Sequence, residues 1–397
     1  MTGSVADHTA PAAAPIAGAA QAFAMAAAGH HLAFFPDGPG RLQRLLQLIE
    51  EAQTSFDVAF YIFADDASGT AVRDALVAAA RRGVAVRLIV DDFGTGTQDA
   101  FFATLTEAGG SFRNFLPRLS RRYLIRNHQK LAIADGRIAM LGGFNVADDY
   151  FAAPGGDAWH DLGFTIEGAS VARLAEWFAR LDELAETTGG QFRAIRRAVG
   201  GWDRGNDPVQ VLIGGPAKGL SSWARVISAD LVHGMRLDMV MAYFSPPRRL
   251  RRRMRRIAAN GQTRLLLAGK TDNGATIGAA RLLYRSLLRS GAQLWEYQPS
   301  KLHMKLIVLD DAVYLGSANF DMRSLYLNLE IVVRIRDAGL ADRMREFVSA
   351  QLGVSQAITP AVHRQQGGWF NRLRWVISWF LVSVLDYSVS RRLNLGL

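Results

Sequence analysis

Two stretches decide the fold of this chain: HQKLAIADGRIAMLGGFN at His128–Asn145 and HMKLIVLDDAVYLGSAN at His303–Asn319. Each stretch begins with a His-x-Lys pair, continues through an apolar run to an aspartate, and ends at a glycine-containing turn that carries an asparagine. The two histidines lie 175 residues apart, which is close to half of the 397-residue chain. A repeat at this spacing predicts that the protein is built from two similar halves.

The sequence around these stretches repeats as well. A strand, a helix and a second strand are expected before each stretch, at 56–64, 69–82 and 84–91 in the first half and at 237–245, 247–260 and 262–269 in the second. A further strand and helix are expected after each, within 163–178 and 332–347. Tyr61 and Tyr243 fall near corresponding strand ends. The alternation predicts an α/β fold of two homologous halves, each a mostly buried β-sheet flanked by helices, related by a pseudo-two-fold axis.

The composition restricts the classes of function. Cysteine is absent, which excludes disulfides and thiolate metal sites. The net charge of +10 indicates an anionic partner, and both nucleic acid and an acidic membrane surface meet that description. No run of about 18 or more apolar residues, the length that spans a bilayer, occurs in the sequence.

A single His-x-Lys pair carries little information, because a buried histidine beside a chance lysine explains most such pairs. Duplication changes this, since only five of the 46 basic residues are lysine and yet both stretches have one. On a strand, residues i and i+2 point to the same face, so each histidine is expected beside its lysine. Phosphodiester exchange needs a nucleophile, a proton donor and positive charge around the phosphoryl oxygens. Two histidines, two lysines and two asparagines can supply these without a metal.

With these residues in place, the paired stretches resemble the motifs of the phospholipase D superfamily. The details are most similar to bacterial cardiolipin synthases of the short type without N-terminal membrane spans, through Gly142–Asn145, Trp159–Asp161 and Gly316–Glu330. Two features depart from the general pattern. Gly143 stands where the motif has serine, and the second copy is one residue shorter between its aspartate and the following glycine. We expect the chain to differ locally at the strand-to-turn junction of the second copy.

The resemblance implies a ping-pong reaction in which one histidine attacks phosphorus and the other protonates the departing alcohol. It implies His128 as the nucleophile and His303 as the acid and base, although the symmetry leaves the order open. The lysines of the motif are Lys130 and Lys305, and phosphate contacts are expected from Asn145, Asn319 and Ser317. Asp161 and Glu330 are expected to orient the imidazoles, against the alternative of surface charges. Asp135 and Asp310 complete the catalytic motif, with a structural role near the strand ends favoured. No metal and no cofactor are expected.

Four segments are predicted: a flexible Ala/Pro-rich leader at 1–30, the halves at 31–200 and 201–365, and a basic, apolar C-terminal segment at 366–397. A helix with seven arginines between Arg248 and Arg256, and a basic cluster at 117–130, can attract anionic lipids or can simply be solvated. The apolar core at 375–385, with nearby tryptophans and arginines, favours shallow insertion into a membrane interface. The alternative is a terminal helix docked on the protein itself.

The leading interpretation is a cardiolipin synthase-like phosphatidyltransferase acting on anionic phospholipids, with phosphatidylglycerol or a related lipid as acceptor. Peripheral attachment to the cytoplasmic face of a bacterial cell membrane is expected. A phospholipase D or phosphatidylserine synthase is the alternative enzyme, and a nuclease of the superfamily comes next. The tryptophan-bearing C-terminus argues against nucleic acid. If the protein were a non-enzymatic binding module, at least one His-x-Lys pair would be expected to be lost, whereas both pairs are intact. The sequence does not indicate an oligomeric state.

Overall fold

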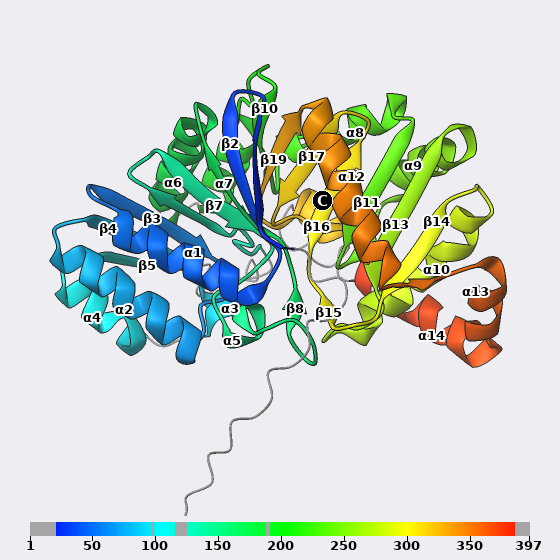
Figure 1. Cartoon of the computed structure of the whole chain (residues 1–397), viewed down its shortest axis with the longest axis horizontal. Coiled ribbons are helices and arrows are strands. Elements are labelled where there is room, and N and C mark those ends of the chain that lie inside the picture. The colour runs from blue at the N-terminus through cyan, green and yellow to red at the C-terminus, as the bar shows by residue number, and fades with distance from the viewer. Residues whose placement is uncertain (1–20, 97–98, 116–124, 188–190, 386–397) are drawn as a thin grey trace, which may run out of the picture.

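Two eight-stranded sheets form the framework of the protein (Figure 1), seen in a computed structural model that describes residues 21–96, 99–115, 125–187 and 191–385. The first sheet runs in the order β1 (Phe23–Ala27), β2 (His30–Phe35), β9 (Gly163–Glu167), β7 (Ile138–Gly142), β6 (Leu131–Ala134), β3 (Ser55–Phe60), β4 (Ala85–Asp91), β5 (Ser111–Phe115). The second runs in the order β10 (Val209–Gly214), β19 (Glu330–Arg336), β17 (Ala312–Gly316), β16 (Lys305–Leu309), β11 (Arg236–Met241), β13 (Gln262–Ala268), β14 (Gln293–Tyr297), β20 (Gln356–Ala357).

Counted in their order across the sheet, seven strands run from β2 to β5 in the first sheet and seven run from β10 to β14 in the second. The two sets have the same order and the same directions. In each sheet the last three of these strands are parallel and the others pair antiparallel. The predicted fold of two homologous α/β halves is therefore confirmed. Their near-continuous apolar strands, such as β16 and β17, are buried along their whole length, as expected for strands covered on both faces.

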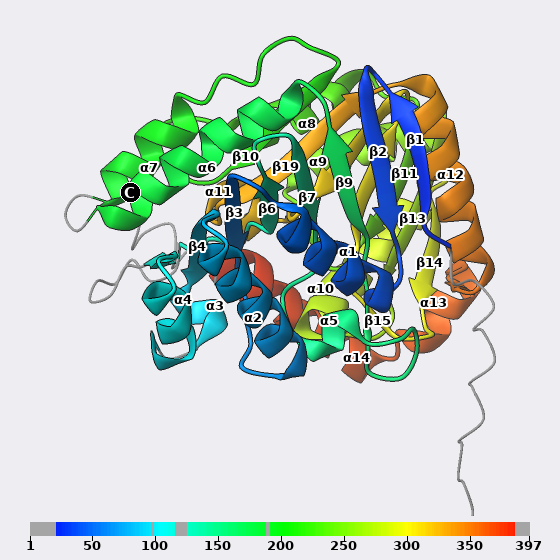
Figure 2. The ribbon, with the colours of Figure 1, turned by 60° about the vertical axis from the view of Figure 1, so that its left-hand side comes forward.

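Helices cover the sheets in three layers. The outer face of the first sheet packs on α1 (Gly38–Glu51), α2 (Ala67–Arg81) and α4 (Ala103–Glu107). The outer face of the second packs on α8 (Ser222–His233), α9 (Arg248–Asn260) and α10 (Gly274–Leu288). The inner faces share one apolar core with α6 (Ser170–Glu186), α7 (Gln191–Gly200) and α12 (Ala338–Gly353). Because this core joins both sheets, the halves form one body (Figure 2).

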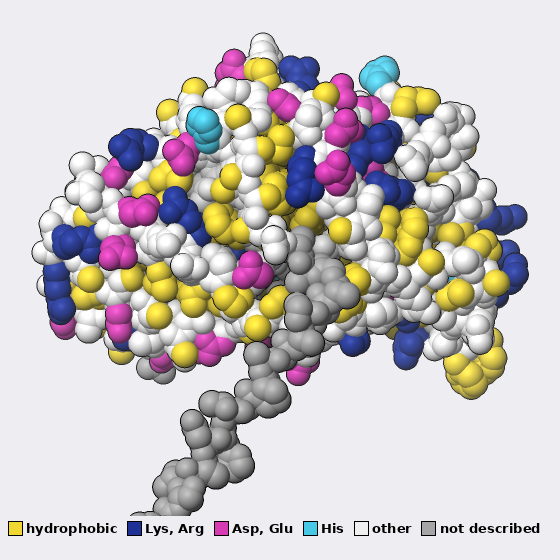
Figure 3. Space-filling model, in the orientation of Figure 1, with side chains coloured by type: hydrophobic (Ala, Val, Ile, Leu, Met, Phe, Trp, Pro, Cys, Tyr) yellow, Lys and Arg dark blue, Asp and Glu magenta, His cyan; other side chains and the backbone are white. Residues whose placement is uncertain are grey.

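Short elements surround the sheet ends: α3 (Asp92–Thr95), η1 (Asp99–Phe102), α5 (Asp148–Phe151), α11 (Met322–Tyr326), α13 (Pro360–Gln366), α14 (Trp369–Trp379) and the π-helical η2 (Phe380–Leu385). Two small parallel pairs join β8 (Trp159–His160) to β15 (Lys301–Leu302) and β12 (Phe244–Ser245) to β18 (Phe320–Asp321). Hydrophobic side chains project at the lower right of the molecule, over the end of the chain that carries α14 (Figure 3). Among the described residues no helix combines the length and hydropathy needed to cross a bilayer.

Two predicted strands end earlier than expected. The strand predicted at 56–64 ends at Phe60, and the one predicted at 237–245 ends at Met241. In both halves the chain then leaves the sheet and pairs with the segment after the motif asparagine. In the first half Ala64 N–H donates to Val146 O, and in the second half β12 pairs with β18. This detour brings the residues after each strand to the centre of the molecule.

Part of the predicted leader segment forms a strand. Residues 1–20 lie outside the described part of the chain, whereas Phe23–Ala27 form β1, paired antiparallel with β2 through a turn at Ala28 and Gly29. Both turn residues have positive φ, at 48° and 75°, which suits a two-residue hairpin. Phe23 stacks on Phe34 at 4.8 Å, so an aromatic pair holds the hairpin on the sheet.

The one-residue difference between the two motif copies lies in the hairpin turns, and not near the glycines as expected. In the first half Ala134 pairs with Ile138 across a three-residue turn, whereas in the second Leu309 pairs with Ala312 across a two-residue turn. Beyond the turns the registers match, because Leu131 faces Leu141 as Leu306 faces Leu315. The other ends of these strands, where the histidines lie, are therefore unaffected.

Candidate active site

The two histidines come from the segments that precede β6 and β16, and each segment is tied to the opposite half. His128 N–H donates to Leu329 O at 2.9 Å, and His303 N–H donates to His160 O at 2.8 Å. The histidines are thus not within strands, as the sequence suggested, but at crossings between the halves. Because Leu329 and His160 precede Glu330 and Asp161, each crossing brings one histidine to the carboxylate of the other half.

The imidazole–carboxylate contacts follow from this exchange. Nδ1 of His128 lies 3.0 Å from Oε2 of Glu330, and Nδ1 of His303 lies 2.7 Å from Oδ2 of Asp161. Both carboxylates are completely buried, so neither is a surface charge. A carboxylate on Nδ1 fixes the ring and its tautomer and leaves Nε2 for the reacting group.

Both motif lysines are buried beside their histidines. Lys130 Nζ donates to His128 O at 2.7 Å. Lys305 Nζ donates to His303 O and lies 2.9 Å from Nδ1 of the same residue. Two ammonium groups are therefore held at the junction of the halves, where they can neutralise the charge of a phosphoryl group.

The predicted phosphate contacts divide into two kinds. Asn145 and Asn319 are buried; Asn145 Oδ1 accepts from Ile62 N–H at 3.2 Å, and Asn319 Oδ1 is a buried atom without a partner within the described structure. Ser317, in contrast, donates its hydroxyl to Oε2 of Glu330 and accepts from Ile331 N–H at 3.1 Å. In this structure Ser317 therefore contacts the carboxylate of Glu330, and its predicted phosphate contact stays a prediction.

Gly143, which replaces the serine of the motif, has a steric explanation. A Cβ at this position would lie 2.7 Å from both carboxylate oxygens of Asp161 and 2.9 Å from Cδ of Lys305. The carboxylate occupies the space that a serine side chain would need. Glycine is thus required here because Asp161 approaches the backbone closely.

The third residues of the motif lie at the far ends of the strands. Asp135 accepts from the backbone N–H groups of residues 53–55 at 2.7–3.1 Å, and Asp310 accepts from those of Met235 and Arg236 at 2.8–3.3 Å. Both have positive φ, 53° and 48°, at the turns after β6 and β16. This geometry supports a structural role, in which each carboxylate fixes the start of the neighbouring strand.

The surroundings of both imidazoles favour their neutral form. Burial, with the charge of Lys305, lowers the pKa of His303 to about 3 in spite of Asp161. Burial and the charges of Lys130, Lys305, Arg126 and Arg323 lower the pKa of His128 well below its usual value. Burial also lowers the pKa of Lys305 to about 8 and that of Lys130 in the same direction. A bound phosphodiester would bring negative charge and shift all four pKa values upward.

The two carboxylates differ in charge. Burial raises the pKa of Glu330 to about 7, against the opposing effect of Lys130. Burial also acts to raise the pKa of Asp161, but Lys305 and the contact with His303 outweigh it and hold the pKa below its usual value. Asp161 is therefore ionised at neutral pH, whereas Glu330 is close to its midpoint there. His303 thus faces a full negative charge, which favours its imidazolium form.

The surroundings of the two rings also differ, and sequence reasoning missed most of these residues. His303 is enclosed by aromatic rings: Trp159 and Tyr150 lie edge-on at 5.2 and 5.1 Å, and the Tyr150 hydroxyl is 3.5 Å from Nε2. Tyr243 lies edge-on at 6.4 Å and donates to Asp272. Tyr61 and Tyr243 had a signal in the sequence, as matching residues of the repeat. Tyr150 had none, because its counterpart in the second half is Ser324.

His128 lies instead among cations. Tyr61 packs on its ring at 5.0 Å and receives a hydrogen bond from Arg126 at 3.2 Å. Asp91 accepts from Asn127 N–H at 2.7 Å and so fixes the residue before the histidine. The basic cluster predicted at 117–130 lies largely outside the described residues, but Arg126 belongs to it. The site therefore has a cationic side at His128 and an aromatic side at His303.

A buried arginine connects the parts of the first half around the site. The guanidinium of Arg41 donates to Pro36 O at 2.8 Å and to Asp161 O and Tyr150 O at 2.7 Å each. One side chain therefore holds Pro36, Tyr150 and Asp161 together, and no sequence pattern singled it out.

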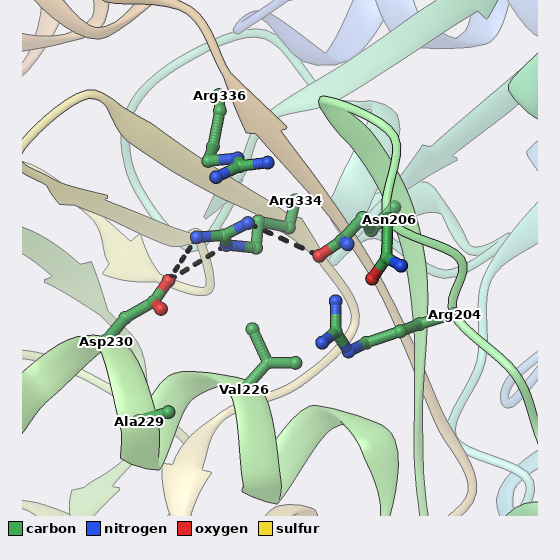
Figure 4. Close-up of a pocket in the computed structure, with 8 residues that line it drawn as sticks. Arg204, Asn206, Val226, Ala229, Asp230, Arg334 and Arg336 are labelled. Atoms are coloured by element: carbon green, nitrogen blue, oxygen red, sulfur yellow. Dashed lines mark hydrogen bonds and ion pairs between the residues drawn. The ribbon is translucent and has the colours of Figure 1, made fainter.

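A cavity of about 290 Å³ lies away from the histidines, at the end of β19 opposite Glu330 (Figure 4). Arg334 crosses it and pairs with Asp230 at 2.6 Å and with Gln210 at 3.3 Å. Arg204 and Arg336 also line the cavity. Arg334 is engaged by its neighbours, so we assign the cavity no part in the chemistry. Among the described residues no cluster of three or more histidine, aspartate or glutamate side chains could hold a metal.

Comparisons with known proteins agree with this geometry. Residues 45–181 and 233–351 match the family described as "Cardiolipin synthase, PLD-like domain". The major cardiolipin synthase ClsA of Bacillus subtilis is 30% identical over 362 residues, covering 88% of this chain and 74% of the relative. Cardiolipin synthase B of Salmonella typhimurium is 30% identical over 337 residues, covering 80% of this chain and 79% of the relative.

A solved structure shows the same fold. The crystal structure of phosphatidylserine synthase from Haemophilus influenzae aligns with a TM-score of 0.71 at 15% identity, covering 93% of this chain and 96% of the other. At this identity the likeness concerns the fold alone. The shared fold extends through both halves, because nearly the whole of each chain is aligned.

Proposed function

The chain belongs to the cardiolipin synthase family of the phospholipase D superfamily, and we propose that it transfers a phosphatidyl group from one phosphatidylglycerol to a second and releases glycerol. The observation that carries this proposal is the reciprocal exchange between the halves, in which each histidine is held on Nδ1 by a buried carboxylate of the other half. Two Nε2 atoms and two ammonium groups thereby serve one site, which suits a double displacement at phosphorus.

In the first step, Nε2 of His128 attacks phosphorus and the bond from phosphorus to the glycerol oxygen breaks. Protonated His303 gives its Nε2 proton to the departing oxygen, so glycerol leaves uncharged. Lys130 and Lys305 neutralise the non-bridging oxygens, and the carboxamides of Asn145 and Asn319 donate to them. A phosphatidyl group is then bound to His128.

In the second step, a hydroxyl of another phosphatidylglycerol enters where glycerol left. Neutral His303 takes the proton of that hydroxyl, its oxygen attacks phosphorus, and the bond from phosphorus to Nε2 of His128 breaks. Cardiolipin leaves, and His303 is again protonated for the next turnover. The covalent intermediate separates one difficult exchange into two similar steps.

The charge distribution supports this order of the histidines. His303 faces ionised Asp161, which stabilises the imidazolium that an acid requires. Burial and the neighbouring cations lower the pKa of His128 and keep it neutral, as a nucleophile must be, and the same cations attract the phosphate. The identity of the donor and acceptor lipids is part of the proposal. So is peripheral action at a membrane surface, while the cytoplasmic face stays a prediction from the sequence.

The proposal is tested by incubating purified protein with phosphatidylglycerol vesicles and measuring cardiolipin and glycerol. We expect both products in equal amounts, and none from His128→Ala or His303→Ala. Phosphatidylethanolamine, serine and water are then offered as acceptors. Exclusive use of serine or water, with no cardiolipin formed, would overturn the proposal in favour of a phosphatidylserine synthase or a phospholipase D.

A further inference from the structure

The helix α14 and the start of η2 carry an apolar stripe on their outer side. The large hydrophobic side chains that are at least 44% exposed in this segment are Trp369, Phe370, Leu373, Val376, Ile377, Phe380 and Leu381. They recur at intervals of three and four residues, which places them on one face of a helix. Seven of the ten exposed large hydrophobic residues in the described part of the chain lie here, so the stripe is a local feature and not a general property of the surface.

The opposite side of α14 is docked on the protein. Trp375 is 2% exposed and stacks on His363 with ring centres 5.2 Å apart. Ser378 lies so close to α10 that a Cβ on Gly278 would be 2.6 Å from its hydroxyl oxygen. The helix is therefore held in one orientation, and its apolar stripe is presented outward as a fixed surface. Docking and an exposed apolar face, which the sequence suggested as alternatives, are both present.

Arginines mark the borders between the docked face and the stripe. At about 100° per residue, Arg372 lies roughly 60° from Trp375 on one side and Arg374 roughly 100° on the other. Both are exposed. A helix that lies in a bilayer interface has this pattern, because its apolar face enters the acyl region while basic side chains stay at the level of the headgroups.

The helix that carries the stripe is connected to the active site through α10. Gly278, which contacts Ser378, is in the first part of α10, and α10 begins two residues after Asp272. Asp272 accepts from Tyr243, which packs on His303, so the start of α10 leads to the aromatic side of the site. In the views of Figures 1 and 2, α14 and α3 both lie on the lower side of the molecule.

The first half contributes a second contact on that side. Phe93 in α3 is 57% exposed, and the guanidinium of Arg126 lies 3.9 Å from the centre of its ring. Arg126 also bonds Tyr61, which packs on His128. An exposed aromatic residue with an arginine is thus connected to the cationic side of the site through Tyr61, as the stripe is connected to the aromatic side through α10.

We propose that the stripe on α14 and η2, together with Phe93, docks the protein on the surface of an anionic bilayer and turns the two-histidine site toward the lipid headgroups. The proposal rests on the function proposed above, since only a lipid substrate requires this orientation. The bordering arginines select an anionic surface, because each basic residue near such a surface strengthens binding roughly fivefold. A second copy of the chain is the competing occupant of the stripe.

The test compares binding of the full-length protein to vesicles of phosphatidylglycerol with phosphatidylcholine and to vesicles of phosphatidylcholine alone. Phe370→Ser with Ile377→Ser should weaken binding to the first vesicles by about 100-fold, since each buried apolar side chain contributes roughly tenfold or more. Arg372→Gln with Arg374→Gln should weaken it about 25-fold and leave binding to phosphatidylcholine unchanged. Leu220→Ser with Met235→Ser is the matched control, since both residues are exposed elsewhere, at 40% and 51%, and should bind like wild type.

Two further measurements keep the outcome clear. Brominated acyl chains should quench the fluorescence of wild type more than that of Trp369→Phe, whether or not other variants fold well. Activity on short-chain phosphatidylglycerol dispersed below its micelle concentration should be equal in wild type and in the Phe370→Ser, Ile377→Ser variant. If neither wild type nor the variants acted on short-chain phosphatidylglycerol, the proposed function would be wrong. The vesicle-binding experiment would still test whether the stripe docks on a bilayer. Unchanged vesicle binding of the Phe370→Ser, Ile377→Ser variant would overturn the inference. It would also be overturned if wild type did not bind vesicles and formed a dimer that this double substitution dissociates.

Discussion

Replacing Gly143 by alanine tests the packing that holds the site together. The added Cβ would lie 2.7 Å from both oxygens of Asp161, whereas ordinary contacts of a Cβ begin near 3.4 Å. The carboxylate must therefore retreat by about 0.7 Å in a close-packed interior. Its 2.7 Å contact with Nδ1 of His303 would lengthen beyond hydrogen-bonding distance if the retreat is away from the ring.

We expect kcat to fall roughly 10- to 100-fold, because a misplacement of about 1 Å at a reacting group costs on the order of 100-fold. The free energy of unfolding should fall by about 1–3 kcal/mol from overpacking. The assay measures cardiolipin formed from phosphatidylglycerol vesicles, with thermal unfolding followed in parallel. The added Cβ would also lie 2.9 Å from Cδ of Lys305, so KM is expected to rise together with the fall in kcat.

Gly200→Ala is the matched control. The nearest atom to its Cβ would be 3.8 Å away, so the substitution should leave kcat within twofold of wild type. If Gly143→Ala also kept kcat within twofold, the carboxylate would not need its observed position, and the reasoning about Asp161 and His303 would be refuted.

Three other predictions follow from the site. The value of kcat/KM should fall on the alkaline side with a midpoint at about pH 8 or below. The reason is that burial lowers the pKa of Lys305 to about 8, so its charge is lost as the pH rises through that value. A midpoint above about pH 9.5 would contradict this. Asp135→Ala should lower the free energy of unfolding by roughly 1–2 kcal/mol and leave kcat nearly unchanged, because the Asp135 carboxylate accepts from backbone N–H groups far from the histidines. A large loss of kcat in a stable variant would instead show that Asp135 takes part in the reaction. Activity should persist in excess chelator, because the lysines supply the positive charge; loss that is restored by a divalent cation would show a metal requirement.

The repeat and its two motifs were enough to predict the fold and the residues at its centre. The reason is physical: the apolar strands beside His128 and His303 recur with the same residue types, so both halves must bury the same kind of sheet. The paired placement of Asp161 and Glu330 after each motif also directed attention to the imidazoles. That each carboxylate serves the histidine of the opposite half was not predictable, since it depends on crossings between residues more than 140 apart in sequence.

Other parts of the site left no pattern in the sequence. Arg41 is one of many arginines, and only its burial among three carbonyl groups distinguishes it. Tyr150 has no partner in the repeat, although its hydroxyl lies 3.5 Å from Nε2 of His303. The turn at Asp310 is a difference that is visible in the sequence but does not affect the site. The second motif is one residue shorter because its hairpin turn is one residue shorter, and this turn lies at the far end of the strands from the histidines.

The central claim, that one phosphatidyl group passes through a histidine between two displacements, is tested most directly by trapping the intermediate. Wild-type protein is mixed with phosphatidylglycerol, quenched within one turnover under alkaline conditions that preserve a phosphorus–nitrogen bond, and digested for mass spectrometry. We predict a phosphatidyl adduct on the peptide that contains His128, formed and consumed at rates that account for cardiolipin production. An adduct on His303 would reverse the assigned roles, and cardiolipin formed without any adduct would contradict the double displacement.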